Sequence, residues 1–183
     1  MMKKRNRKRI SCLLSALLLL VMSIGWSVMA MADDAVNKDS SKPTVWIIGD
    51  STVSSFADNY YYPRYGWGTQ IDKYLDGTYE VKNIALSGRS SKSYVNDKEY
   101  NELTSGMKHG DYLLIGFGHN DEKAEADRYT DPNGDYKTAG SFANSLYENY
   151  IKPAQAAGTT VILCTPIVRR TATTEWSDSN LHI

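Results

Sequence analysis

Short apolar runs recur along residues 44–164, and segments of mixed polarity separate them. The run at residues 45–48 is apolar at every position, and the runs at 112–117 and 161–164 are nearly so. A continuous apolar run between turn residues is typical of a strand that is buried on both faces of a parallel sheet. We expect strands at residues 44–49, 79–85, 111–117 and 159–164.

Apolar residues at helical spacing occupy the segments between these strands. We expect a short amphipathic helix at residues 69–75, a second at 97–107 and a long one at 139–157, which Pro153 should bend or shorten. Strands that alternate with helices form right-handed βαβ units. The predicted fold is therefore α/β, a three-layer α/β/α sandwich around a parallel sheet.

The amino-terminal segment differs from the rest of the chain. Six Lys and Arg residues lie between positions 3 and 9, residues 10–30 carry no charge, and Ala30-Met31-Ala32 is a small-x-small site. This order predicts a secretory signal peptide at residues 1–32, followed by a polar linker at 33–43 and one domain at 44–183. We expect a secreted, extracellular protein. An uncleaved membrane anchor is the alternative, because the apolar stretch is long enough to span a bilayer.

The charge of the chain changes if this segment is removed. The whole chain carries 21 Lys and Arg against 21 Asp and Glu. Losing the six basic residues leaves 15 against 21, a formal charge of about −6. An acidic protein lacks the basic surface that nucleic acids need, so we expect no nucleic-acid partner. Cys12 leaves with the segment and Cys164 remains alone, which predicts a buried thiol and no intrachain disulfide.

Three polar or flexible residues each follow a predicted strand: Ser51, Gly88 and Asn120. The carboxyl ends of parallel strands share one edge of the sheet, so we expect these residues to converge. Ser51 is then a candidate nucleophile, and two backbone N–H groups with the Asn120 amide are candidate donors to an oxyanion. The alternative is that Asp50 or Ser51 only caps the following segment. We expect Asp50 and Asp121 to hold their turns.

These residues lie in motifs that resemble the SGNH (GDSL-type) hydrolases, in particular the rhamnogalacturonan acetylesterase branch. The motifs are Gly49-Asp50-Ser51-Thr52, Tyr65-Gly66-Trp67-Gly68, Ser87-Gly88-Arg89-Ser90-Ser91, Phe117-Gly118-His119-Asn120-Asp121 and Thr165-Pro166-Ile167-Val168-Arg169-Arg170. The resemblance implies a flavodoxin-like sheet and deacetylation of plant cell-wall polysaccharide. It also implies Ser51 as nucleophile, an oxyanion hole from Ser51, Gly88 and Asn120, and no metal or cofactor. We expect a monomer whose partner is acetylated polysaccharide or oligosaccharide.

The resembling family also has a late Asp-x-x-His block that supplies the general base, and residues 44–183 lack it. Asp178 precedes His182 by four residues rather than three. We therefore expect the domain to be incomplete at its carboxyl end, with the base outside it. His119 is a less favoured substitute base. A GDSL-type lipase or lysophospholipase and a catalytically incomplete carbohydrate-binding remnant are the alternative functions.

Three residues are candidate substrate contacts. Arg89 could bind the carboxylate of an acidic sugar such as galacturonate, because a guanidinium pairs well with a carboxylate. An ion pair between Arg89 and a loop carboxylate is the alternative. Tyr61, in the cluster of residues 60–62, and His119 are candidates for the rim of the sugar site. Trp67 is expected in the core, since it lies on an apolar helical stripe.

Overall fold

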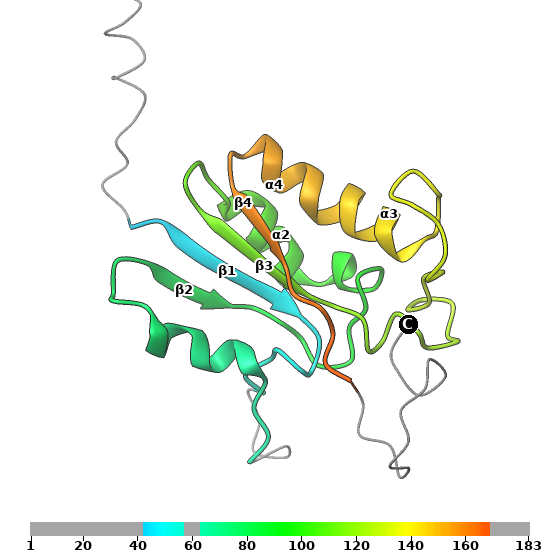
Figure 1. Ribbon diagram of the computed structural model, residues 1–183, viewed down its shortest axis with the longest axis horizontal. Helices are drawn as coiled ribbons and strands as arrows, with labels where there is room; N and C mark the ends of the chain where they lie inside the picture. Colours follow the sequence, from blue (N-terminus) through cyan, green and yellow to red (C-terminus); the bar gives the residue numbers. More distant parts are fainter. Residues whose placement is uncertain (1–41, 57–62, 169–183) are drawn as a thin grey trace, which may run out of the picture. The chain divides into compact units, whose positions relative to one another are not determined.

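The computed structural model describes residues 42–56 and 63–168, in which four parallel strands form one sheet. The strand order is β2-β1-β3-β4, as in flavodoxin-like sheets (Figure 1). The predicted parallel α/β fold is confirmed, although the outer strands β2 and β4 are shorter than expected. Their bounds are β1, Thr44–Gly49; β2, Glu80–Asn83; β3, Tyr112–Gly116; and β4, Thr160–Leu163.

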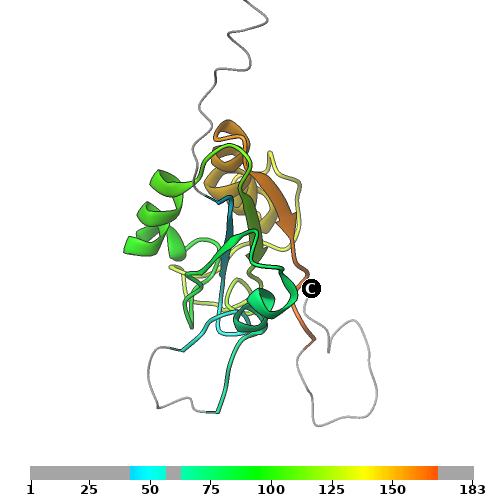
Figure 2. The same cartoon turned by 90° about the vertical axis from the view of Figure 1, so that its left-hand side faces the viewer.

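Helical segments cover both faces of this sheet (Figures 1 and 2). The side chains of α2, α3, η4 and α4 share one core cluster with Trp46, Ile48 and Leu113, and the other face packs against η2. Trp67 of η2 lies against this second cluster, as expected. The helical bounds are η2, a 3₁₀ helix, Trp67–Tyr74; η3, Tyr94–Asn96; α2, Lys98–Gly106; α3, Phe142–Leu146; η4, a π turn, Tyr147–Ile151; and α4, Lys152–Ala156.

The predicted long helix at 139–157 is wrong in detail. It begins at Phe142 because the Ser141 side chain accepts a hydrogen bond from the Asn144 N–H and caps the first turn. A π turn, η4, interrupts it and ends at Ile151, two residues before Pro153. Pro153 has no N–H for the carbonyl of Asn149, and that carbonyl accepts a hydrogen bond from the Tyr100 hydroxyl instead.

A buried carboxylate connects the strands at the amino end of the sheet. Asp111 precedes β3 and is fully buried. One of its oxygens accepts from the Thr44 N–H, and the other accepts from the Trp46 indole and the Lys108 N–H, at 2.8 to 3.1 Å. These bonds fix where β1 and β3 begin, and no sequence motif indicated them.

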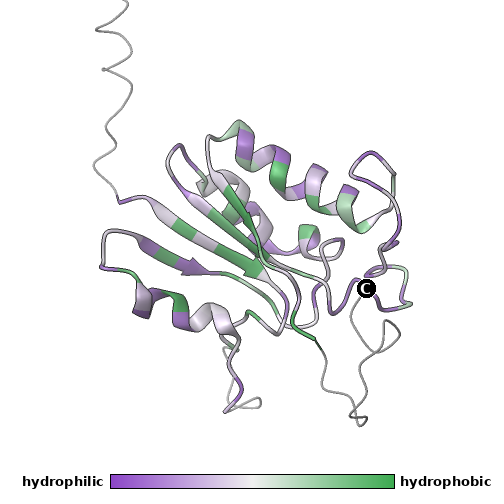
Figure 3. Cartoon of the chain, in the orientation of Figure 1, coloured by the Kyte–Doolittle hydropathy of each residue, from purple (hydrophilic) through white to green (hydrophobic). Residues whose placement is uncertain are grey.

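The edge strand β4 is less covered than its neighbour β3. Its Ile162 and Leu163 are 43% and 56% exposed, whereas Ile115 in the adjacent β3 is 2% exposed. Figure 3 shows that β4 is nevertheless apolar. Within the described ranges, no helix has the length and apolarity needed to cross a bilayer. The predicted signal peptide at residues 1–32 lies outside the described part of the chain.

Candidate active site

Ser51 lies in the turn that follows β1, where the strand order reverses between β1 and β3. In open α/β sheets this position forms the ligand-binding crevice. The buried Asp50 carboxylate holds the turn: one oxygen accepts from the Thr52 N–H and hydroxyl, and the other accepts from the His119 N–H at 3.3 Å. The predicted turn-holding role of Asp50 is confirmed, and it leaves Ser51 part-exposed at the edge of the sheet.

Two backbone N–H groups are available beside this serine. Within the described residues, neither the Ser51 N–H nor the Gly88 N–H donates a hydrogen bond. Gly88 has a φ of +79°, and a Cβ built on it would meet nothing within 4 Å. Glycine is therefore favoured here by its left-handed backbone, and not by a close approach of neighbouring atoms.

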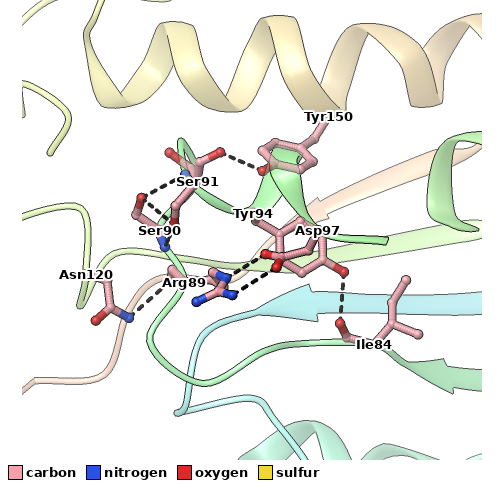
Figure 4. Close-up of polar contacts among 9 residues, drawn as sticks. Ile84, Arg89, Ser90, Ser91, Tyr94, Asp97, Asn120 and Tyr150 are labelled. Atoms are coloured by element: carbon pink, nitrogen blue, oxygen red, sulfur yellow. Dashed lines mark hydrogen bonds and ion pairs between the residues drawn. The ribbon is translucent and has the colours of Figure 1, made fainter. Parts of the chain in front are cut away.

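The loop after Gly88 is held by a network of polar contacts (Figure 4). The Ser91 carbonyl accepts from the Tyr150 hydroxyl at 2.6 Å, and Ser90 and Ser93 bond to each other's N–H groups. Tyr94 extends its hydroxyl to the Ile84 carbonyl. A loop bonded at this many points holds the Gly88 N–H in place before any ligand arrives, as oxyanion stabilisation requires.

The Arg89 side chain belongs to this network. Its Nε and Nη2 atoms donate to the two carboxylate oxygens of Asp97 at 2.6 and 2.9 Å (Figure 4). Asp97 occupies the N-cap position of α2 but makes no side-chain cap bond. The structure thus shows the ion-pair alternative for Arg89, and its guanidinium is not among the groups that line the pocket at Ser51.

Asn120 is buried and held at both ends of its amide. The Nδ2 group donates to the Arg89 carbonyl at 3.0 Å, and Oδ1 accepts from Arg128 Nη1 at 3.3 Å. Arg128 is in turn paired with Glu125. The bond to Arg89 brings Asn120 to the residue after Gly88, as the strand-end argument predicted. A second amide hydrogen remains for a ligand.

Asp121 connects the loops after β2 and β3. Its buried carboxylate accepts hydrogen bonds from the Ser91 N–H and hydroxyl and from the Thr130 hydroxyl. Asp121 therefore holds a neighbouring loop through its side chain. Burial raises the pKa of Asp121 above its ordinary value, and the hydrogen bonds from Ser91 and Thr130 oppose part of that shift.

His119 faces the segment that follows β4. Its Nε2 atom lies 2.7 Å from the Ile167 carbonyl oxygen. A carbonyl only accepts, so Nε2 carries the proton and is unsuited to remove one from Ser51. His119 does not line the pocket at Ser51. Tyr61 and the late His182 lie outside the described residues.

An open pocket of about 490 Å³ adjoins the serine. Its lining was not predicted from the sequence, apart from Ser51 itself. The segment before η2 reaches this pocket because Gly66 passes so close to Val53 that a Cβ would lie 2.2 Å from the Val53 carbonyl carbon. The Gly66 N–H also donates to the Ser54 carbonyl. The described residues that line it are Ser51, Phe56, Pro63, Arg64, Tyr65 and Ser87.

Metal ligands do not cluster in the described ranges: no group of three His, Cys, Asp or Glu side chains there could hold an ion. A second cavity of about 230 Å³ lies beyond the Asn120 loop, between Asp121, Phe142 and Pro166. Burial raises the pKa of the Cys164 thiol, which makes it a poor nucleophile at neutral pH.

The fold and site together define a flavodoxin-like α/β protein whose strand-end serine is surrounded by hydrogen-bond donors. Residues 45–181 match the family described as GDSL-like lipase/acylhydrolase, and the chain belongs to this family. A probable rhamnogalacturonan acetylesterase of Bacillus subtilis, YesY, is 32% identical over 126 residues, which are 68% of this chain and 54% of that protein. A rhamnogalacturonan acetylesterase of Emericella nidulans is 35% identical over 78 residues, 43% of this chain and 28% of that protein.

Among solved structures, protein YxiM of Bacillus subtilis has the same fold, with a TM-score of 0.58 and 29% sequence identity. The match covers 78% of this chain and 38% of that one. The chain thus spans about half the length of YesY and less of the other two proteins.

Proposed function

We propose that the protein is a secreted serine esterase that removes O-acetyl groups from plant cell-wall polysaccharide of the pectin or rhamnogalacturonan type. The proposal rests mainly on one observation, the convergence of three strand ends. Ser51 shares a pocket with Ser87, and Asn120 is bonded to Arg89 on the other side of Gly88. Similarity to rhamnogalacturonan acetylesterases supports the substrate class.

The proposed chemistry is acyl transfer through a covalent intermediate. Ser51 Oγ attacks the acetyl carbonyl carbon while a general base takes its proton, and the oxygen that becomes negative is stabilised by the N–H groups of Ser51, Gly88 and Asn120. The bond to the sugar oxygen then breaks, and the base gives its proton to this oxygen, which leaves as a hydroxyl. In the second step, water attacks the acetyl ester of Ser51, and acetate leaves. The base is proposed to come from an Asp-x-x-His block beyond residue 183.

The test is acetate release from acetylated pectin. We expect release by the chain extended through an Asp-x-x-His block, and loss of nearly all of it in Ser51→Ala. For the 183-residue chain, we expect hydrolysis of p-nitrophenyl acetate no faster than by its own Ser51→Ala variant. Equal rates for the extended form and its Ser51→Ala variant contradict the role of Ser51.

Two further measurements address the alternatives. The pocket at Ser51 includes Ser87 and Arg64, which suit a polar substrate better than a long acyl chain. We expect p-nitrophenyl acetate to be a better substrate than the octanoate, and the reverse preference would indicate a lipase.

Secretion predicts a mature protein that begins at Asp33, which mass spectrometry of culture medium can test.

A further inference from the structure

Arg64 and the candidate nucleophile line the same pocket. The volume of about 490 Å³ falls within the roughly 300–1,000 Å³ typical of small-ligand sites. Ser51 and Ser87 line it at the carboxyl ends of β1 and β2, and Pro63, Arg64 and Tyr65 line it from the segment before η2. A group bound at Arg64 therefore lies in the pocket that Ser51 also lines.

The Arg64 guanidinium differs from the other arginines of the described ranges. Arg89 is bound by Asp97, and Arg128 is bound by Glu125. Arg64 is exposed and forms no ion pair or hydrogen bond with any residue in these ranges. The positive charge of Arg64 thus has no partner in the part of the chain that the structure describes.

No carboxylate is among the described residues that line this pocket either. The nearest acidic residue in sequence to the nucleophile, Asp50, is buried, and both its oxygens are committed to Thr52 and His119. Among the described residues that line the pocket, Arg64 is therefore the one that carries a charge. Guanidinium groups bind planar carboxylates through two parallel hydrogen bonds, which favours this ligand group over a neutral hydroxyl.

We infer that Arg64 forms an anion-binding subsite that holds the carboxylate of an acidic sugar while the acetyl ester of the same chain lies at Ser51. The choice of substrate in this inference rests on the proposed esterase function. Arg64 takes the place of Arg89 as the residue that binds the acidic sugar. It assigns specificity between acetylated uronate and acetylated neutral sugars to one side chain.

The test is a binding measurement, which does not depend on the general base. The probe is a mono-O-acetylated galacturonate trisaccharide, compared with its carboxyl methyl ester, titrated by calorimetry into the Ser51→Ala chain. We expect the free acid to bind at least about tenfold more tightly than the methyl ester. Adding Arg64→Gln should abolish this preference, and Arg64→Lys should retain part of it. Lys152→Gln, on the exposed side of α4, is the matched control and should leave it unchanged.

Several results would overturn the inference: no measurable binding of either probe, equal affinity for acid and ester, or an undiminished preference in Arg64→Gln. Circular dichroism verifies that each variant is folded, and Arg64→Lys provides a second comparison if Arg64→Gln is not. Ser51-dependent acetate release from an extended form, without carboxylate preference, refutes the role of Arg64 alone. A carboxylate preference without Ser51-dependent release refutes the esterase and leaves Arg64 as a binding residue.

Discussion

At the scale of single residues, the Asn120 amide has its orientation set by two neighbours of opposite hydrogen-bonding character. Arg128 can only donate and the Arg89 carbonyl can only accept. Rotating the amide by half a turn would place donor against donor and acceptor against acceptor. The NH₂ group is therefore kept on the side of the Gly88 loop, where an oxyanion donor is needed.

Replacing Arg128 should weaken this control. In the chain extended through an Asp-x-x-His block, we expect Arg128→Met to lower kcat roughly tenfold with little change in KM. This loss is a fraction of the loss expected when an oxyanion donor is removed outright. Arg128→Lys keeps one donor and should recover part of the rate. Steady-state kinetics on p-nitrophenyl acetate measures both values. A change in KM alone would assign Arg128 to substrate binding instead.

A second prediction concerns the pH dependence of stability at Asp121. Its pKa in the folded protein is raised, so the folded state keeps this proton to higher pH than the unfolded chain does. Its contribution to stability is thus complete below about pH 4 and is lost as the pH rises through the folded pKa. Asp121→Asn lacks this titration, so its Tm should rise relative to that of the parent between pH 4 and 7.

Thermal unfolding monitored by circular dichroism measures this difference. Asp127→Asn, an exposed carboxylate three residues before Thr130, serves as the control and should follow the parent at every pH. A Tm difference for Asp121→Asn that stays constant, or that falls with pH, would contradict the assignment.

The residues of the site could be predicted from the sequence only in part. Ser51, Gly88 and Asn120 were predictable because each follows a strand, and parallel strands end at one edge. Arg64 was not, because its place beside Ser51 depends on the contact of Gly66 with Val53, which no periodicity records. Arg89 had two chemically reasonable partners, and only the position of α2 selects Asp97.

At the scale of elements, β1, β3 and β4 were predicted well because an apolar run has few other solutions in a chain of this size, whereas β2, Glu80–Asn83, contains no such run. The long helix was predicted without the π turn that separates α3 from α4. Periodicity indicates a stripe of Phe142, Leu146 and Tyr150, but it does not distinguish an α-helix from one with a π turn. The turn of η4 keeps Tyr150 buried in the core beside Phe117.

The start of the sheet depends on Asp111. Removing its carboxylate in Asp111→Ala would leave the Thr44 N–H and the Trp46 indole buried without this acceptor, and the part-buried Lys108 N–H would also lose it. We expect a loss of about 3 kcal/mol in the free energy of unfolding, measured with urea. The exposed Asp127→Ala should change it by less than about 0.5 kcal/mol. A loss equally small for Asp111→Ala would show that water replaces the carboxylate.

At the scale of the whole molecule, apolar surface is buried unevenly across the sheet. Ile115 in β3 is 2% exposed in the core cluster under α2, α3, η4 and α4, whereas Ile162 in β4 is 43% exposed. A truncation to alanine measures this difference, because its cost depends on the area buried and the cavity left behind. We expect Ile115→Ala to cost about 3 kcal/mol and Ile162→Ala less than about 1 kcal/mol.

Urea titrations of the two variants provide the comparison. Similar costs at both positions would mean that β4 is covered in solution, by the rest of the protein or by another molecule. For the parent chain, we expect a broad thermal transition of low midpoint, since one edge of its sheet contributes little. A sharp transition at high temperature would contradict this.

The bond from the Tyr150 hydroxyl to the Ser91 carbonyl joins the helical layer to the loop that presents the Gly88 N–H. The geometry of the candidate oxyanion hole therefore depends on the position of Tyr150 in the core, and not on the loop alone. Warming that loosens η4 should disorder the hole while the sheet is still intact. The upper working temperature of the protein would then lie below its melting temperature. Stiffening η4 would raise the working temperature without raising the melting temperature.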